Sequence, residues 1–394
     1  MRCISLLLAI CAITILGLSA CKSSDRSTAR APDGKFRVAF VYVGPIGDAG
    51  WTYAHDLARR ELLRRLDFLE TTYVENVSGG AEAVQVINNL ARKGYDLIIT
   101  TSFGFMDATE ESARLFPNVK FLNITGFKSN GSNFGNLMGA IEEAKYLAGM
   151  IAGARAMDDA RLRVGYIAPF PIAEVIRLVN AFALGVRKTC SACVIEIRWT
   201  NSWFDPPREK EAADSLLQAG VDVVATGADT PSPVVTAAQA GRWGIGYDSP
   251  NACRSSPERC LTVPYWNWAP AYEKIIHDIR EGRFKGTNDY QDMNSGVIGL
   301  VGFMPGETPA PGVPTWVVPL VRERLARMRA GSLTRFDLFA GPLKNNQGVT
   351  VIPAGKRPTQ EDLEGLKGVA GRPDCTICMN WLVEGIHGRL STGN

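Results

Sequence analysis

Hydrophobic and polar positions follow two alternating patterns from residue 36 onward. Short runs such as Phe36–Val43 and Leu162–Ile167 are apolar along almost their whole length, and the segments between such runs place apolar residues at helical spacing. Fully apolar strands that alternate with amphipathic helices are typical of a parallel sheet covered on both faces. Because the alternation restarts after a helical pattern at Glu142–Ala156, the sequence predicts two α/β lobes of similar size.

Within each predicted lobe, strands and helices follow one another closely. The predicted strands are Phe36–Val43, Thr71–Glu75, Asp96–Thr101 and Lys120–Ile124, then Leu162–Ile167, Cys193–Trp199, Val221–Thr226 and Trp243–Tyr247. The predicted helices are Trp51–Leu69, Ala81–Lys93, Met106–Leu115 and Glu142–Ala156, then Ala173–Arg187, Pro207–Gln218 and Pro233–Ala240. After Pro305 the chain is rich in proline and glycine, and we predict only one helix, Val318–Ala330, and a hairpin around Asn345–Gly348.

The first twenty residues have the pattern of a secretion signal. Ile4–Leu18 is an almost unbroken apolar run after the basic Arg2, and it is too short for a membrane span. The next residues, Ser19-Ala20-Cys21, complete a sequence that resembles a bacterial lipobox, in which Cys21 would be lipidated and become the new N-terminus. We expect residues 1–20 to be a signal peptide and residues 21–35 a lipidated, flexible tether. An ordinary signal peptide with an incidental cysteine is the alternative.

Composition and charge narrow the functional classes. The chain has 394 residues, with 43 Lys and Arg against 40 Asp and Glu, and a formal net charge of +3. This balance argues against an electrostatic nucleic-acid binder, which has a clear basic excess. The sequence contains no G-x-x-x-x-G-K-[ST], G-x-S-x-G or H-E-x-x-H motif, and its three histidines, His55, His277 and His387, lie far apart. We therefore predict neither an enzyme nor a bound metal or cofactor.

Six of the nine cysteines remain once the signal segment and Cys21 are set aside. They form three local pairs: Cys190 with Cys193, Cys253 with Cys260, and Cys375 with Cys378. Close pairs in an even number, in an oxidising compartment, favour three short-loop disulfides. A zinc site built from the two C-x-x-C pairs, or a redox-active C-x-x-C, are the alternatives.

Aromatic and acidic residues gather in the loops that follow the predicted strands. Ligands of open parallel sheets bind beyond the carboxyl ends of the strands. Two aromatic rings facing each other across a cleft form a slot for a flat ring, and aspartates beside the slot accept hydrogen bonds from N–H groups. Packing of one lobe against the other is the alternative role for these aromatics. The candidate ligand-binding residues are Asp48, Trp51, Thr52, Ser102, Phe103, Gly104, Phe170, Trp203, Gly227, Asp229, Asp248, Trp266 and Asn267.

Several of these segments resemble those of a known family. They are the Gly-Asp-x-x-aromatic sequence at residues 47–51, Gly94–Ile99, Glu142–Gly149, Trp203–Lys210, Gly244–Asp248 and Trp381–Gly385. Together they resemble the basic membrane lipoprotein family, the substrate-binding lipoproteins of ABC importers that include bacterial purine nucleoside receptors. The resemblance covers residues 36–300 well and the remaining tail loosely.

The resemblance implies a type I periplasmic-binding fold, with two Rossmann-like lobes joined by three crossings. The N-terminal lobe would comprise residues 36–139 and 264–303, and the C-terminal lobe residues 140–263 and 304–394. Hinge bending would close the lobes on a small-molecule ligand. The expected protein is a periplasmic monomer, anchored to the membrane by lipid, that delivers its ligand to an ABC permease and binds no nucleic acid.

The resemblance also implies roles for individual residues. Trp51 and Trp203 correspond to the aromatics that stack on the purine, and Asp48 and Asp248 to the aspartates that hold it. A rival interpretation makes Asp48 or Asp248 the acid or base of a nucleoside hydrolase. A ligand sensor with the same fold that acts on a membrane receptor is another.

Two departures from the nucleoside receptors bear on the ligand. Thr52 stands where those receptors have an asparagine, and Trp266, before Asn267, stands where they have a lysine implicated in ribose contacts. Because a bulky indole would fill the space of the sugar, we expect a free purine base, with adenine as the first choice. A purine nucleoside is the alternative ligand.

Overall fold

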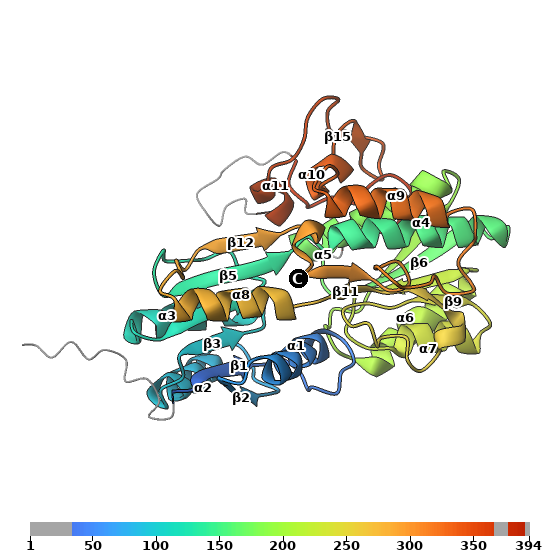
Figure 1. Cartoon of the computed structure of the whole chain (residues 1–394). Coiled ribbons are helices and arrows are strands. Elements are labelled where there is room, and N and C mark those ends of the chain that lie inside the picture. The colour runs from blue at the N-terminus through green and yellow to red at the C-terminus, as the bar shows by residue number, and fades with distance from the viewer. Residues whose placement is uncertain (1–33, 366–376, 391–394) are drawn as a thin grey trace, which may run out of the picture.

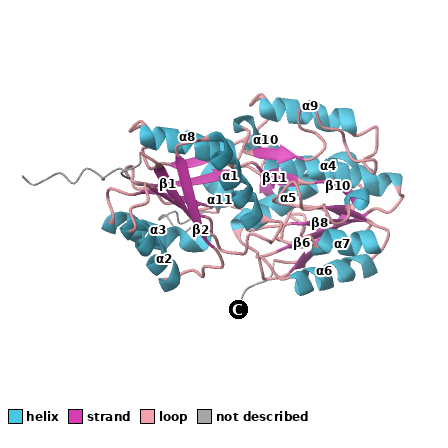
Figure 2. Cartoon of the chain, turned by 60° about the horizontal axis from the view of Figure 1, so that its bottom comes forward, coloured by secondary structure: helices cyan, strands magenta, loops and turns pink. Residues whose placement is uncertain are grey.

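The computed structural model describes residues 34–365 and 377–390, which form two α/β lobes side by side (Figure 1). The strands of the first sheet are β1 (Phe36–Val41), β2 (Leu69–Val74), β3 (Leu97–Thr100), β4 (Lys120–Ile124), β5 (Phe134–Gly139) and β12 (Asn288–Gln291). They lie in the order β12-β5-β4-β3-β1-β2, and every neighbouring pair is parallel. Helices α2 (Ala81–Arg92) and α3 (Met106–Leu115) cover one face, and α1 (Trp51–Arg65) and α8 (Ala269–Arg280) cover the other (Figure 2).

The second sheet repeats this arrangement. Its strands are β6 (Arg163–Ala168), β7 (Val194–Trp199), β8 (Val223–Thr226), β9 (Trp243–Ile245), β10 (Cys260–Thr262) and β16 (Ile386–His387). They are all parallel, in the order β10-β9-β8-β6-β7-β16. Helices α6 (Pro206–Gln218) and α7 (Ser232–Gln239) lie on one face, and α4 (Glu142–Asp158) and α5 (Ala173–Thr189) lie on the other (Figure 2). The prediction of two lobes built on parallel sheets is confirmed.

The chain crosses between the lobes three times, as expected. It leaves the first sheet after β5, returns between β10 and β11 (Pro264–Trp266), and leaves again after β13 (Ile298–Leu300). Strands β11 and β13 form a small antiparallel sheet of their own, with Tyr265 opposite Gly299. The second and third crossings therefore run side by side.

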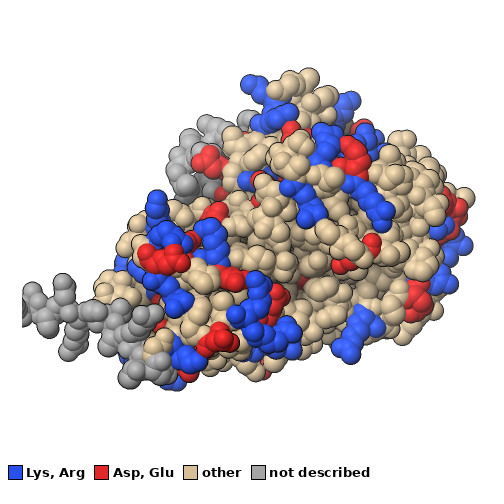
Figure 3. Space-filling model, viewed as in Figure 1, with Lys and Arg blue, Asp and Glu red and all other residues tan. Residues whose placement is uncertain are grey.

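The C-terminal tail packs against the second lobe (Figure 1). Its helix α9 (Val318–Arg329) and short helix α10 (Arg335–Leu338) contact α4, while α11 (Gln360–Glu364) contacts α5. The predicted hairpin is present as β14 (Leu343–Lys344) and β15 (Thr350–Ile352). On the face shown in Figure 3, basic and acidic side chains are interspersed, in keeping with the nearly balanced charge of the chain.

Two of the three predicted disulfides are present, Cys190–Cys193 and Cys253–Cys260. Cys378 is disulfide-bonded as well, and its predicted partner Cys375 lies outside the described residues, as do Cys21 and the predicted signal and tether. Within the described part of the chain, no helix is long and apolar enough to cross a membrane.

Helix α4 is buried over nearly its whole length and packs tightly on α5. A Cβ atom on Gly185 of α5 would overlap the backbone carbonyl of Tyr146, and one on Gly149 of α4 would overlap the carbonyl of Phe182. The two helix backbones thus approach so closely that only glycine fits at these positions.

Replacing Gly185 by alanine should destabilise the protein. Alanine has the better helix propensity, but the steric overlap with Tyr146 forces the helices apart, and overpacking of this kind costs about 1–3 kcal/mol. Urea denaturation of G185A measures the change. The control is G47A, because Gly47 is exposed and has open space around its Cβ position. Equal stability of G185A and wild type would show that the helix pair has room to adjust.

Candidate functional site

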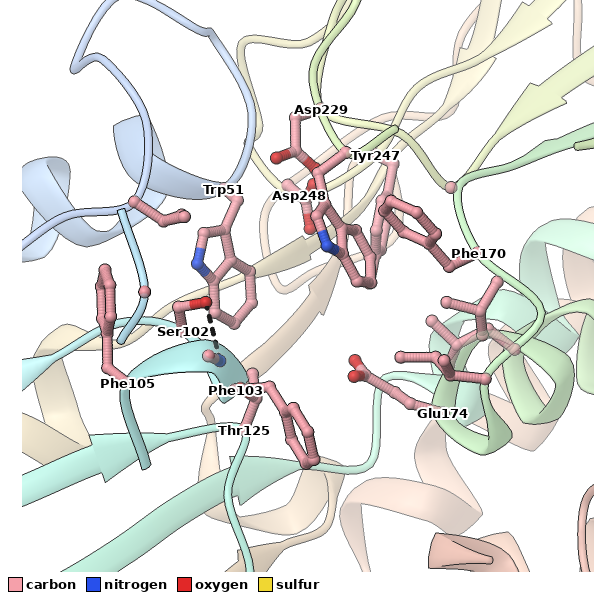
Figure 4. Close-up of a pocket in the computed structure, with 18 of the residues that line it drawn as sticks. Trp51, Ser102, Phe103, Phe105, Thr125, Phe170, Glu174, Asp229, Tyr247 and Asp248 are labelled. Carbon is pink, nitrogen blue, oxygen red and sulfur yellow. Dashed lines mark hydrogen bonds between the residues drawn. The ribbon is translucent and has the colours of Figure 1, made fainter. Parts of the chain in front are cut away.

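A cavity of about 440 Å³ lies between the lobes, beyond the carboxyl ends of both sets of strands (Figure 4). Aromatic side chains from both lobes form most of its wall, and carboxyl groups supply most of its charge. The predicted ligand-binding residues that line it are Trp51, Ser102, Phe103, Gly104, Phe170, Trp203, Gly227, Asp229 and Asp248. The cavity therefore brings together loops of the two lobes that are far apart in sequence.

Trp51 is the first residue of α1 and is held firmly in place. Its indole Nε1 donates a hydrogen bond of 2.7 Å to the backbone oxygen of Thr101. The edge of its ring system meets His55 at 4.5 Å and Trp266 at 5.8 Å between ring centroids. Because neighbours fix the ring, Trp51 presents a preformed aromatic surface to the cavity.

Trp203 contributes an aromatic surface from the second lobe. It lies in the loop between β7 and α6, and its ring centroid is 5.3 Å from that of Phe170. The indole is 38% exposed although it lines the cavity, so a considerable part of its surface is not covered by protein. Such partly uncovered aromatic rings in a cavity are available to stack on a flat ligand.

Asp48 is buried but does not line the cavity. Its carboxylate oxygens accept hydrogen bonds of 2.9 Å from the backbone N–H groups of Gly50, Thr52 and Tyr53. Burial raises the pKa of Asp48, and these N–H donors act against that rise. In this structure Asp48 thus fixes the loop that carries Trp51, at the start of a helix where a carboxylate is favourable.

Three other candidate residues are likewise absent from the cavity wall. Thr52 is buried at the start of α1. Asn267 donates from its side-chain amide to the backbone oxygen of Gly296 at 3.0 Å. Trp266 stacks on Trp268, with ring centroids 4.7 Å apart, and is almost fully buried.

Asp248 joins the cavity wall to the crossing segment. The indole Nε1 of Trp266 donates to Asp248 Oδ1 at 2.8 Å, and the backbone N–H of Trp266 donates to the Asp248 carbonyl at 2.9 Å. Asp248 has a φ of +65°, in the left-handed region that aspartate tolerates better than most residues. Its Oδ2 atom is buried and accepts no hydrogen bond from the described residues. This oxygen is available for a ligand.

Asp229 lies beside Asp248 in the same wall (Figure 4). Burial, together with the negative charges of Asp248 and Asp48, raises the pKa of Asp229 well above its ordinary value. Burial also raises the pKa of Asp248 to about 8, against the opposing effects of Lys145 and the Trp266 hydrogen bond. With a pKa of about 8, the Asp248 carboxyl is mostly protonated at neutral pH, so it can donate a hydrogen bond to the cavity as well as accept one.

The sequence-based prediction missed several residues of the wall. Tyr166 and Thr125 line the cavity, and both hydroxyl groups are buried without a hydrogen-bond partner among the described residues. Glu174, the second residue of α5, points its carboxylate into the cavity (Figure 4). Glu174 could have been predicted, because it closely follows a loop at a strand end. Tyr166 lies inside strand β6, where the sequence pattern predicts a core residue.

The two lobes touch at the edge of the cavity. A Cβ atom on Gly50 of the first lobe would overlap the backbone of Asp229 in the second, so only glycine permits this approach. The side-chain amide of Asn251 donates to the hydroxyl group of Tyr53 across the same boundary at 3.1 Å. These contacts join the two lobes at one edge of the cavity. Over residues 34–365 and 377–390, no group of three or more His, Cys, Asp or Glu side chains could hold a metal ion.

The two parallel-sheet lobes, the three crossings and the aromatic cavity define a two-lobed solute-binding protein. A family model described as ABC transporter substrate-binding protein PnrA-like matches residues 35–311. The chain belongs to this family, as the sequence resemblance indicated. Members of the family are extracytoplasmic binding proteins rather than enzymes, and they bind small molecules and interact with an ABC permease.

Individual relatives agree with this assignment. The chain is 35% identical over 342 residues to a purine-binding protein of Brucella abortus. The matched region covers 86% of this chain and 93% of the relative. The chain is also 38% identical over 259 residues to a candidate ABC transporter glucose-binding protein of Haloferax volcanii, covering 66% and 65% of the two chains. A solute-binding protein structure from Aeropyrum pernix K1 matches with a TM-score of 0.65 at 20% identity, over 84% of this chain and 96% of that one. The last match shows the type I periplasmic-binding fold.

The proton held near Asp248 should make stability depend on pH. In the folded protein the pKa of Asp248 is about 8, whereas its ordinary value is 3.8. Its contribution to stability is therefore fully present below about pH 4 and is lost as the pH rises through about 8. The unfolding free energy of ligand-free D248N should fall less over this range than that of wild type, measured by urea denaturation at several pH values. Identical pH slopes would mean that Asp248 is ionised in the folded state.

Proposed function

We propose that the protein captures a purine in the interlobe cavity and delivers it to an ABC permease, with a free base such as adenine as the preferred ligand. The observation that carries the proposal is a cavity with aromatic surfaces from both lobes and unpartnered polar atoms in its wall. The extensive similarity to the Brucella abortus purine-binding protein supports the same ligand class.

The composition of the wall favours a ligand rich in hydrogen-bond donors. Asp229, Asp248 and Glu174 line the cavity, and no Lys or Arg among the described residues does so. Carboxylates accept hydrogen bonds from the exocyclic amine and ring N–H of adenine, while the protonated carboxyl of Asp248 can donate to a ring nitrogen. Stacking on Trp51 and Trp203 would contribute about 1–3 kcal/mol per aromatic contact.

The preference for a base over a nucleoside depends on Trp266. Its indole occupies Asp248 Oδ1, which leaves only the other carboxylate oxygen for a ligand. A flexible lysine at this position, as in nucleoside receptors, would instead offer a donor to the hydroxyl groups of ribose. The cavity volume of about 440 Å³ is large for a base alone, so adenosine is the necessary comparison.

Glucose is a second candidate, favoured by the similarity to the Haloferax volcanii protein. Each sugar hydroxyl both donates and accepts, and the cavity wall offers carboxyl acceptors more readily than donors.

We also propose that Cys21 is lipidated and holds the protein at the membrane in the periplasm. We prefer transport to sensing as the role of this protein, because its family is described as ABC transporter substrate-binding proteins.

Isothermal titration of the purified protein with adenine, adenosine and D-glucose tests the ligand. We expect adenine to bind with micromolar affinity or better, about −8 kcal/mol, and at least tenfold more tightly than adenosine. Mass spectrometry of small molecules released on denaturation gives an independent readout. Tighter binding of adenosine would refute the base preference, and binding of glucose alone would refute the purine proposal.

Replacing Trp203 by alanine separates stacking from structural packing. If the indole stacks on the ligand, W203A should bind adenine about tenfold or more weakly, with little change in the thermal midpoint of the ligand-free protein. The matched control is W316A, because Trp316 is also 38% exposed but does not line the cavity. Unchanged affinity of W203A with a large loss of stability would assign Trp203 to lobe packing.

A further inference from the structure

Glu174 is an acidic residue of the cavity wall that has no hydrogen-bond partner among the described residues. It is half-buried, lines the cavity, and makes no hydrogen bond or ion pair with any residue in the described ranges. Burial raises the pKa of Glu174 and the charge of Arg177 acts against that rise, but the Arg177 guanidinium makes its hydrogen bonds elsewhere. It pairs with Glu142 at 3.2 Å and donates to Leu363 O at 2.7 Å and to Tyr290 Oη at 2.6 Å.

The position of Glu174 relative to Asp229 and Asp248 indicates which end of a bound ligand it would face. Figure 4 shows its carboxylate on the opposite side of the cavity from Asp229 and Asp248, pointing into the space between Phe103 and Phe170. Asp248 Oδ2 and Tyr166 Oη are almost fully buried, line the same cavity and have no partner in the described structure. The cavity thus has polar groups without a protein partner at both ends and aromatic residues in the wall.

We infer that Glu174 contacts the ligand and accepts a hydrogen bond from the end of the ring system opposite to the end held by Asp229 and Asp248. The site would then select flat ligands with a hydrogen-bond donor at both ends. Adenine meets this requirement with its exocyclic amine at one end and its N9–H at the other. In a nucleoside, ribose hydroxyl groups would supply the second donor. The inference rests on the proposed function, since it takes a purine as the ligand.

A purely structural role for Glu174 is the competing explanation. An acidic residue in the first turn of a helix interacts favourably with the helix N-terminus, whatever the ligand. Glu82 provides a matched control, because it is the second residue of α2 as Glu174 is of α5, and it is exposed and outside the cavity wall. A structural role predicts similar behaviour of E82Q and E174Q toward ligands.

The test combines these variants with adenines that lack one donor. Wild type, E174Q, D229N and E82Q are titrated with adenine, with 9-methyladenine, which has no donor at N9, and with purine, which has no exocyclic amine. We expect E174Q to weaken adenine binding about tenfold, because the neutral amide oxygen of glutamine accepts a hydrogen bond more weakly than a carboxylate does. E82Q should bind adenine like wild type.

The pattern across ligands decides the inference. The loss caused by E174Q should vanish with one of the two modified ligands, and the loss caused by D229N should vanish with the other, because the two residues face opposite ends. Adenosine identifies the second donor: an E174Q loss with adenosine as large as with adenine means that ribose hydroxyls also serve.

Three results would overturn the inference. They are unchanged adenine affinity of E174Q, an E174Q loss that persists with both modified ligands, and losses for E174Q and D229N that vanish with the same ligand. If adenine binds wild type while one of these results is found, the proposed function stands and only the role of Glu174 fails. If no purine binds wild type, both fail.

Discussion

Desolvation of acidic groups at the contact between the lobes is the constraint on which the rest of the site depends. A buried carboxylate is costly unless it is hydrogen-bonded or protonated. The buried carboxyl groups of this site are stabilised in different ways. Asp48 accepts three backbone N–H groups, and one oxygen of Asp248 accepts an indole N–H. Burial raises the pKa of Asp248 to about 8 and that of Asp229 well above its ordinary value, which favours their neutral forms. Glu174 makes no hydrogen bond with the described residues.

The hydrogen bond between Trp266 and Asp248 links the buried carboxyl group of Asp248 to the segment by which the chain crosses between the lobes. Trp266 ends β11, one of the strands by which the chain crosses between lobes, and its ring stacks on Trp268. Trp268 in turn stacks on His55, whose Nδ1 is 2.7 Å from the hydroxyl oxygen of Tyr272 on α8. A continuous set of rings therefore connects the wall of the cavity with the first lobe. Burial lowers the pKa of His55 and keeps its ring neutral within this stack.

The fold could be predicted largely from sequence because its central strands are continuous apolar runs. Most predicted strands and helices of the βα units agree with the structure within a few residues. Strand β5 was missed although it is buried and pairs with β4, because Gly135, Asn136 and Gly139 are residue types that are depleted in strands. Two other missed strands share a different physical cause. Strand β12 lies at a sheet edge and is polar, β16 has only two residues, and both pair with strands distant in sequence. Such pairing is decided by tertiary contacts rather than by a local pattern.

The site was less predictable for a different reason. The rule that ligands bind at strand ends selected Trp51, Trp203 and Asp248, which line the cavity. Sequence cannot distinguish an aspartate that binds a ligand from one that orders its own loop, and Asp48 is bonded to its loop in the structure. Trp266 was expected to fill the space of a sugar. The structure places its indole against Asp248 and outside the cavity wall.

A ligand with hydrogen-bond donors at both ends would hold the two lobes together. Direct contacts between the lobes at the cavity edge are slight, consisting of the approach of Gly50 to Asp229 and the hydrogen bond from Asn251 to Tyr53. Asp48, Asp229 and Asp248 lie near one another across the boundary between the lobes. Burial raises the pKa values of Asp229 and Asp248, and repulsion among the three carboxylates, wherever they are ionised, raises them further. A ligand that donates to these carboxyl groups relieves the repulsion and satisfies buried acceptors only in the closed form. Its binding energy therefore favours the closed lobes over the open ones.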